Sequence, residues 1–210
     1  MENKENKELD RLSYALGMSM GNNFKSSGIE KIDCQDFADG VAAVYDGATP
    51  KMSYDEAKQV IQYFFTQLQE KQNAAVAEMA KVNAAAGKAF LEENAKRPEV
   101  KTLESGLQYE VITEGDGQKP AANDTVKVHY TGKLIDGTVF DSSVERGQAA
   151  VFGVTQVIPG WVEALQLMSV GSKWRLYIPS ELAYGAQGAG NVIGPNATLI
   201  FDVELLGIEA

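Results

Sequence analysis

The sequence predicts an α+β protein: an N-terminal all-α region with a long connecting helix, then an antiparallel β-sheet wrapped on one short helix. Up to residue 97 the apolar residues recur at helical spacing, and after Pro98 they alternate in short runs. A single helical pattern lies inside the second part, after a Pro-Gly breaker. We therefore expect a helical dimerisation domain over residues 1–70, the rest of the connecting helix over 71–97, and a sheet domain over 98–210.

Composition limits the classes of function. The 210 residues are 44% hydrophobic, which is enough to bury a core, and 19 basic against 29 acidic residues give a net charge of −10. This charge repels phosphate backbones and anionic lipids, so we expect neither nucleic acid nor membrane as a partner. One cysteine and one histidine offer no Cys/His metal cluster, and we expect no metal and no cofactor. Without a visible signal segment the expected location is cytoplasmic, or periplasmic or surface-exposed if a signal peptide was removed.

Two amphipathic helices are expected near the N-terminus. The first follows apolar spacing from Leu9 to Met20, and the second runs from its N-cap, Asp33, to Tyr45. Helices of this length need each other, a third helix or a second copy to cover their apolar stripes. We expect a symmetric dimer built by residues 1 to about 70.

A long helix is predicted next. Ser53 and Glu56 form the S-x-x-E pattern of a helix start, and no proline follows until Pro98. The pattern indicates roughly 40 residues, about 60 Å of helix. Its alanine-rich part, from about Gln72 to Lys96, is expected to be an exposed spacer arm. The alternative is a coiled coil, because apolar positions from 61 to 89 alternate steps of four and three.

The second half reads as strands around one helix. Alternating apolar residues predict four strands, at Leu107–Val111, Val126–Tyr130, Trp174–Ile178 and Leu199–Leu205. Asp136-Gly137 predicts a hairpin turn between Leu134-Ile135 and Val139-Phe140. The only helical pattern, from Trp161 to Met168, follows Pro159-Gly160 and places Trp161, Leu165 and Met168 on one face.

The sequence shows no motif that indicates acid–base or nucleophilic catalysis. His129 alternates with Val128 and Tyr130, so it points outward if they point inward. Aromatic residues instead gather where one concave face is expected: Tyr130, Phe140, Trp161, Tyr184 and Phe201, with Val157 and Ile158 beside them. Asp141 is the one carboxylate of this group. An aromatic pit with few polar groups suits an apolar ring ligand.

Several ordered motifs resemble the FK506-binding-protein (FKBP-type) peptidyl-prolyl cis-trans isomerases. They are Val128-His129-Tyr130-Thr131-Gly132, Phe140-Asp141-Ser142-Ser143, Val157-Ile158-Pro159-Gly160-Trp161, Ala183-Tyr184-Gly185 and Ala197 to Leu205. The resemblance covers about half the chain, from roughly Val100 onward. The helical half looks like the bacterial dimeric branch that includes the macrophage infectivity potentiator proteins, through its layout and the segment Leu12 to Gly17.

The resemblance implies an FKBP-like fold and an isomerase, or rotamase, that assists protein folding. The catalytic residues it implies are Tyr130, Phe140, Asp141, Ile158, Trp161, Tyr184 and Phe201, with the proline ring on Trp161. It further implies that substrate or macrolide contacts come from Val157, Arg146, Phe152, Val192 and Ile193. Partners would be unfolded or nascent proline-containing chains, held in a chaperone-like manner by a homodimer, with FK506-like or rapamycin-like macrolides as inhibitors.

Two departures from the family pattern are visible. Ala150 replaces a phenylalanine that lines the pocket in many members, so that side is expected to be more open. The loop 186–191 lacks the histidine of small eukaryotic members. The alternative function is a non-catalytic chaperone or scaffold that binds proline-containing peptides without turning them.

Overall fold

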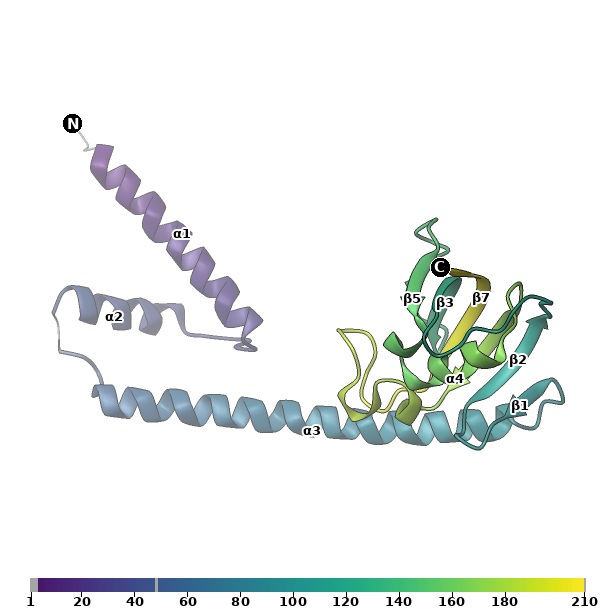
Figure 1. The fold of residues 1–210 in the computed structure, drawn as a ribbon. Coiled ribbons are helices and arrows are strands. Elements are labelled where there is room, and N and C mark those ends of the chain that lie inside the picture. Colours follow the sequence, from purple (N-terminus) through teal and green to yellow (C-terminus); the bar gives the residue numbers. More distant parts are fainter. Residues whose placement is uncertain (1–3, 48, 210) are drawn as a thin grey trace. The chain divides into compact units, whose positions relative to one another are not determined.

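The computed structural model describes residues 4–47 and 49–209 (Figure 1). The chain divides into two compact units between Gln72 and Asn73. The first unit contains helices α1 (Lys4–Ser26) and α2 (Cys34–Tyr45) and the first part of α3 (Tyr54–Asn94). The second contains the rest of α3 and the sheet. None of the helices in the described ranges is long and apolar enough to cross a membrane.

The helix starts in the first unit follow the predicted capping. The Asp33 side chain accepts hydrogen bonds from the backbone N–H groups of Gln35 and Asp36, at 2.9 and 3.0 Å. The Ser53 hydroxyl accepts one from the Glu56 N–H at 3.2 Å. Both predicted helix starts, of α2 and α3, are thereby confirmed.

Helix α1 begins at Lys4, five residues before the predicted start at Leu9. The prediction relied on apolar periodicity, which the first residues lack. Lys and Glu are nevertheless good helix formers, so propensity alone extends the helix toward the N-terminus.

The second unit is a seven-stranded antiparallel sheet in the order β1-β2-β6-β7-β3-β4, with β5 paired to β3. Its strands are β1 (Val100–Thr102), β2 (Gln108–Thr113), β3 (Thr125–Leu134), β4 (Val139–Ser142), β5 (Ala150–Gly153), β6 (Lys173–Ile178) and β7 (Leu199–Glu209). All four predicted strands are present. The predicted turn joins β3 to β4, with Gly137 at a φ of 91°.

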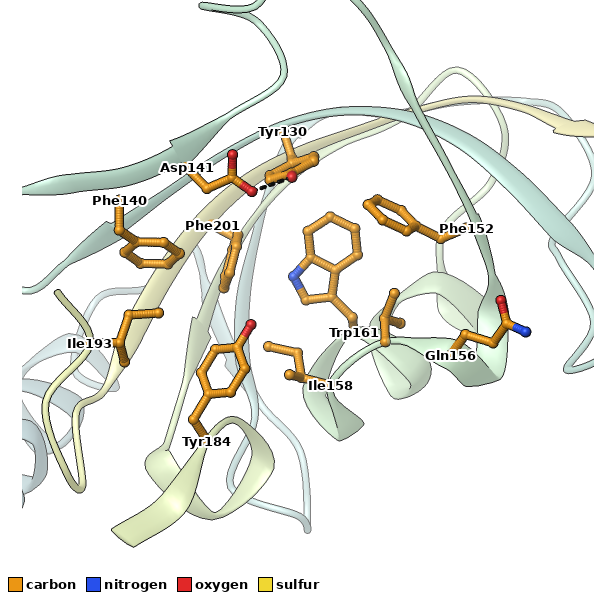
Figure 2. Close-up of a pocket in the computed structure, with 11 residues that line it drawn as sticks. Tyr130, Phe140, Asp141, Phe152, Gln156, Ile158, Trp161, Tyr184, Ile193 and Phe201 are labelled. Atoms are coloured by element: carbon orange, nitrogen blue, oxygen red, sulfur yellow. Dashed lines mark hydrogen bonds between the residues drawn. The ribbon is translucent and has the colours of Figure 1, made fainter. Parts of the chain in front are cut away.

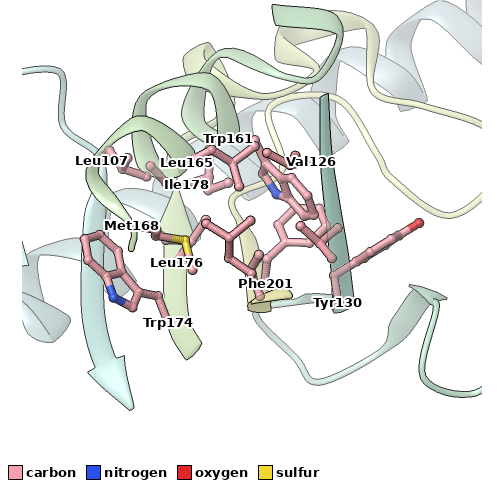
Figure 3. Close-up of a cluster of buried hydrophobic side chains, with 14 of the residues drawn as sticks. Leu107, Val126, Tyr130, Trp161, Leu165, Met168, Trp174, Leu176, Ile178 and Phe201 are labelled. Carbon is pink, nitrogen blue, oxygen red and sulfur yellow. The ribbon is translucent and has the colours of Figure 1, made fainter. Parts of the chain in front are cut away.

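The core lies between the sheet and helix α4 (Pro159–Leu167), whose start is two residues earlier than predicted (Figure 3). The predicted apolar face is confirmed: Trp161, Leu165 and Met168 are buried. Gly160 allows the helix to approach β6, because a Cβ there would lie 2.6 Å from Ile178 Cγ2. The aromatic floor of the site is thus held directly on the sheet.

The end of α3 packs on the sheet domain. Asn83 Nδ2 donates to the Pro195 carbonyl at 2.8 Å, and a Cβ on the buried Gly87 would lie 2.2 Å from Thr198 Oγ1. The prediction of an exposed arm as far as Lys96 is therefore wrong for this part of the helix. Small and polar residues make these two contacts, and Phe90 and Leu91 of the same helix pack against Val100, Tyr177 and Ile200.

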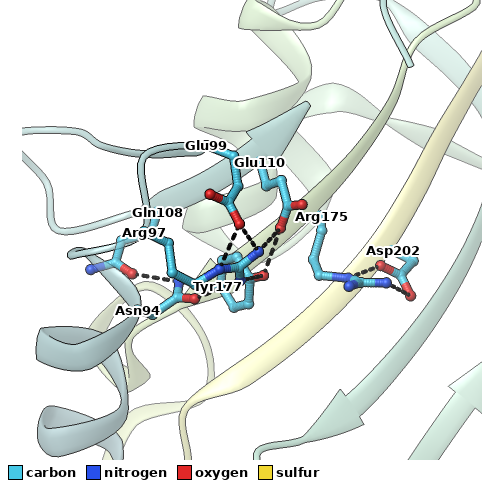
Figure 4. A network of polar contacts seen from close by, with 8 residues as sticks. All are labelled: Asn94, Arg97, Glu99, Gln108, Glu110, Arg175, Tyr177 and Asp202. Carbon is cyan, nitrogen blue, oxygen red and sulfur yellow. Dashed lines mark hydrogen bonds and ion pairs between the residues drawn. The ribbon is translucent and has the colours of Figure 1, made fainter. Parts of the chain in front are cut away.

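A polar network joins the C-terminal end of α3 to the sheet (Figure 4). The buried Asn94 donates from Nδ2 to Gln108 Oε1 at 2.9 Å. Arg97 Nη2 pairs with Glu110 Oε2 at 2.9 Å, and Arg97 Nη1 donates to the Tyr177 hydroxyl at 2.8 Å. These contacts tie the last turn of α3 and the segment directly after it to β2 and β6.

Candidate active site

A cavity of about 610 Å³ lies between the concave face of the sheet and the start of α4 (Figure 2). Strands β3, β4, β5 and β7 and the segments before α4 and after β6 contribute to its wall. The lining residues are Tyr130, Phe140, Asp141, Phe152, Gln156, Val157, Ile158, Trp161, Tyr184, Ile193 and Phe201. Asp141 is the only ionisable group among them apart from the two tyrosines.

The floor of the cavity is the indole of Trp161, which is 4% exposed. The rings of Tyr130 and Phe201 stand nearly perpendicular to it, at 87° and 84°, each with its centroid 5.3 Å from the Trp161 centroid. Phe152 adds a third perpendicular ring at 6.0 Å. Edge-to-face packing of this kind is favourable and holds each ring in one orientation. The result is a rigid apolar slot of defined shape.

Gly132 makes room for two of these rings. It lies on β3, paired with Asp141 on β4 and Phe201 on β7. A Cβ at this position would lie 2.6 Å from Phe140 Cε2 and 2.6 Å from Phe201 Cε1, well inside normal contact. The glycine therefore allows both aromatic walls to close over the same strand.

Asp141 lies in a hydrogen-bonded group at the edge of the slot. Its carboxylate accepts from the Tyr130 hydroxyl and pairs with the Arg146 guanidinium. Arg146 Nη2 also donates to the Tyr130 hydroxyl at 3.1 Å. The three side chains hold one another in place.

The pKa of Asp141 is lowered by these contacts. Burial opposes ionisation of the carboxyl, but hydrogen bonds from Tyr130 and Arg146 outweigh it and hold the pKa below its ordinary value. Burial raises the pKa of Tyr130, and its hydrogen bond to Asp141 adds to the rise. At neutral pH the pair is an ionised carboxylate and a neutral phenol, so neither group is poised for proton transfer.

The lining residues include donors without a protein partner in the described ranges, among them the Tyr184 hydroxyl, the Ile158 backbone N–H and Trp161 Nε1. In Figure 2 the Tyr184 hydroxyl points toward the centre of the cavity. A buried donor without a partner, such as Trp161 Nε1, is costly, whereas Tyr184 is 40% exposed. A ligand carbonyl can accept a hydrogen bond from donors of this kind.

The structure brings most predicted site residues together. The seven predicted catalytic residues line the cavity, with Val157, Phe152 and Ile193. Arg146 contacts Asp141 and Tyr130 without lining the cavity. Val192 lies outside it: its side chain is 48% exposed and faces a neighbouring cavity beside α3.

Some positions were missed or differ from expectation. Gln156 lines the cavity and was not predicted, although it directly precedes the Val157-Ile158 motif. Ala150, expected to open one side, packs against the core, and Phe152 forms the wall there. His129 is not a lining residue, and its Nδ1 lies 3.1 Å from Ser143 Oγ.

Comparison with known proteins agrees with this geometry. Residues 116–206 match the family model described as FKBP-type peptidyl-prolyl cis-trans isomerase, and residues 9–111 match the domain amino terminal to it. The chain is 49% identical over 196 residues to the FKBP-type 22 kDa peptidyl-prolyl cis-trans isomerase of Escherichia coli, covering 93% of each. It is 46% identical to the outer membrane protein MIP of Legionella longbeachae, covering 95% of this chain and 85% of the relative. The crystal structure of FkpA from Escherichia coli is similar over 100% of this chain and 98% of FkpA, with 39% identity and a TM-score of 0.75.

Proposed function

Because the chain belongs to the FKBP-type peptidyl-prolyl cis-trans isomerases and is itself such an isomerase, we propose that it turns X-Pro bonds in the cavity over Trp161. The observation that carries this assignment is the rigid aromatic slot, whose floor and walls are apolar and whose single carboxylate is already paired. A non-catalytic binder, the alternative function, is not favoured for a chain of this family.

The slot suits a reaction that needs no proton transfer. Turning an X-Pro bond passes a barrier of about 18–20 kcal/mol, because the amide loses resonance as it twists. A water-excluding slot that fits the twisted amide better than either planar isomer lowers this barrier. Trp161 carries the proline ring, and Tyr130 and Phe201 limit its orientation.

The family resemblance also implies a role for two of the unpaired donors. The Ile158 N–H and the Tyr184 hydroxyl donate hydrogen bonds to ligand carbonyls on either side of the slot. Asp141 stays ionised and, together with Arg146, orients the Tyr130 ring. A group can donate to a ligand in this way only if it has no protein partner, and neither the Ile158 N–H nor the Tyr184 hydroxyl has one in the described ranges.

The site is tested by exchange NMR on a short Ala-Xaa-Pro peptide. Phe140→Ala removes a wall of the slot and should lower kcat/KM by roughly tenfold or more, because the twisted amide is held less firmly. Phe90→Ala is the matched control, since Phe90 packs on Tyr177 away from the slot. Equal rates in both variants would show that the slot has been misassigned.

Macrolides of the FK506 or rapamycin type are proposed to occupy the same slot. A ligand that fills it should abolish peptide isomerisation competitively and change the fluorescence of Trp161. Trp174 stacks on Tyr109 in another part of the domain, with centroids 4.3 Å apart, so a Trp174→Phe background isolates the Trp161 signal. Inhibition without that fluorescence change would contradict a shared site.

A symmetric homodimer through the first unit is also proposed. No residue of α2 is buried, and large apolar side chains of α1 and α2 stay largely exposed, among them Leu12 at 55% and Val44 at 64%. A second copy would cover such stripes. Light scattering on the full chain measures the dimer directly, and a monomeric mass would end this proposal.

The dimer is proposed to raise activity on long clients. Two slots acting on one unfolded chain operate at raised effective concentration, a gain that a tetrapeptide cannot have. A fragment beginning at Asn73, the boundary of the second unit, should be monomeric and keep its tetrapeptide rate. It should lose much of its rate on a proline-limited refolding protein. Full refolding activity in the fragment would contradict the dimer's role.

The compartment is a further proposal. One relative is named an outer membrane protein, so we favour a location outside the cytoplasm over the cytoplasm. The test is cell fractionation. The chain is produced from its own gene with a C-terminal epitope, and the epitope is then located in the cytoplasmic fraction or outside it.

A further inference from the structure

A second cavity, of about 620 Å³, adjoins the proline slot within the same unit. Val76 and Met79 on α3 line one side, and Leu134 and Val192 contribute to the rest. Val76, Met79 and Val192 are 53%, 51% and 48% exposed. Three large apolar side chains are therefore half uncovered around one groove.

Ile193 connects this groove to the slot, because it lines both cavities and is only 8% exposed. In Figure 2 its side chain lies at the edge of the slot, near Phe140 and Tyr184. The wall it forms is held in place. Ala189 and Ile193 exchange two backbone hydrogen bonds, at 2.8 and 3.1 Å, and Asn83 on α3 holds the carbonyl two residues further on.

We propose that this groove binds an apolar side chain of the same polypeptide whose proline occupies the slot. The inference rests on the proposed slot and extends it to the substrate class. An extended chain advances about 3.3 Å per residue, so residues near the proline reach across Ile193 into the groove. The groove has one ionisable lining residue, Asp136, and otherwise offers apolar and neutral surface, which fits an aliphatic side chain.

Such a groove selects unfolded clients. A folded protein buries its leucines and valines, whereas an unfolded chain presents them beside its prolines. Binding both groups at once lets the enzyme prefer exposed, proline-containing segments. A short peptide without an apolar residue uses the slot alone.

The experiment compares two sets of peptides on the full-length chain. One set carries a single leucine about two to five residues from the proline on either side, and the other carries alanine there. The best leucine peptide should have a kcat/KM about fivefold above its alanine counterpart, because part of the leucine surface leaves water. Val76→Thr and Met79→Gln should each reduce this preference while leaving the alanine peptide unchanged.

Val82→Thr is the matched control. Val82 is on the same helix and 56% exposed but does not line the groove, so its variant should keep the full preference. The Met79 methyl NMR signal should shift with the leucine peptide and not with the alanine peptide. Light scattering should give the same mass for all variants.

Three results would overturn the proposal. One is the absence of a leucine preference, and another is a preference that survives Val76→Thr and Met79→Gln. The third is a lower mass for Val76→Thr with unchanged kinetics, which would assign the groove to a second copy of the chain. A wild-type protein inactive on the alanine peptide would instead refute the slot, and the groove inference with it.

Discussion

Replacing Gly132 by alanine would insert a methyl group between two aromatic walls of the slot. The new Cβ would lie 2.6 Å from Phe140 Cε2 and from Phe201 Cε1, whereas carbon atoms in contact are about 3.5–4.0 Å apart. The rings must therefore move by roughly 1 Å or more. Overpacking of this kind costs about 1–3 kcal/mol of unfolding free energy, and a displacement of about 1 Å in a site costs up to roughly a hundredfold in rate.

Two measurements separate these effects. Urea unfolding gives the loss of stability, and exchange NMR on a short X-Pro peptide gives the rate of the folded variant. Gly207→Ala is the control, since Gly207 lies on β7 with nothing within 4 Å of its Cβ position. We expect it to keep both stability and rate. A folded Gly132→Ala that isomerises the peptide within twofold of the wild type would refute the assignment of the slot.

Gly87→Ala should lower the unfolding free energy by about 1–3 kcal/mol, because its methyl would meet Thr198 Oγ1 at 2.2 Å, although alanine favours a helix by about 1 kcal/mol. A more stable variant in urea would contradict the packing of α3 there. The fragment beginning at Asn73 should unfold at higher urea than one beginning at Glu99, since only the longer fragment keeps the helix contacts, and equal midpoints would refute this. The pKa of Asp141 is lower in the folded protein than its value of about 3.8 in the unfolded chain. The ionised carboxylate therefore contributes its full stabilisation above about pH 3.8, and this contribution is lost as the pH falls through the lower, folded-state pKa. The stability difference between wild type and Asp141→Asn should therefore shrink below about pH 3.8 and stay constant from about pH 5 to 8. Urea unfolding of both proteins from acid to neutral pH measures this stability difference. A difference that grows as the pH falls would contradict a lowered pKa for Asp141.

Much of the site was accessible from local sequence. The Pro-Gly breaker before Trp161, the alternation around Tyr130 and the Asp136-Gly137 turn each depend on residues close together in the chain. Turn chemistry and side-chain periodicity are local, so they predicted four of the seven strands, the hairpin and a helix that begins within two residues of the start of α4. The motifs then indicated which aromatic residues converge, and the lining of the cavity agrees.

Long-range contacts were decided by the tertiary structure. Gly87 meets Thr198, and Asn94 bonds Gln108, through small and polar groups that carry no hydrophobic signal. Phe90 and Leu91 also pack on the sheet domain, but they stand in an alanine-rich stretch that was interpreted as an exposed arm.

Periodicity by itself determined that this protein is helical first and a sheet afterwards, and the family motifs determined which residues form an aromatic slot. The tertiary structure was needed to show that Gly132 leaves room for two rings over one strand and that Ile193 lines both cavities. The reason is physical. The spacing of apolar residues in the sequence shows which face of a helix or strand a side chain lies on. The residues that pack against that face are distant in the chain, so the spacing does not identify them.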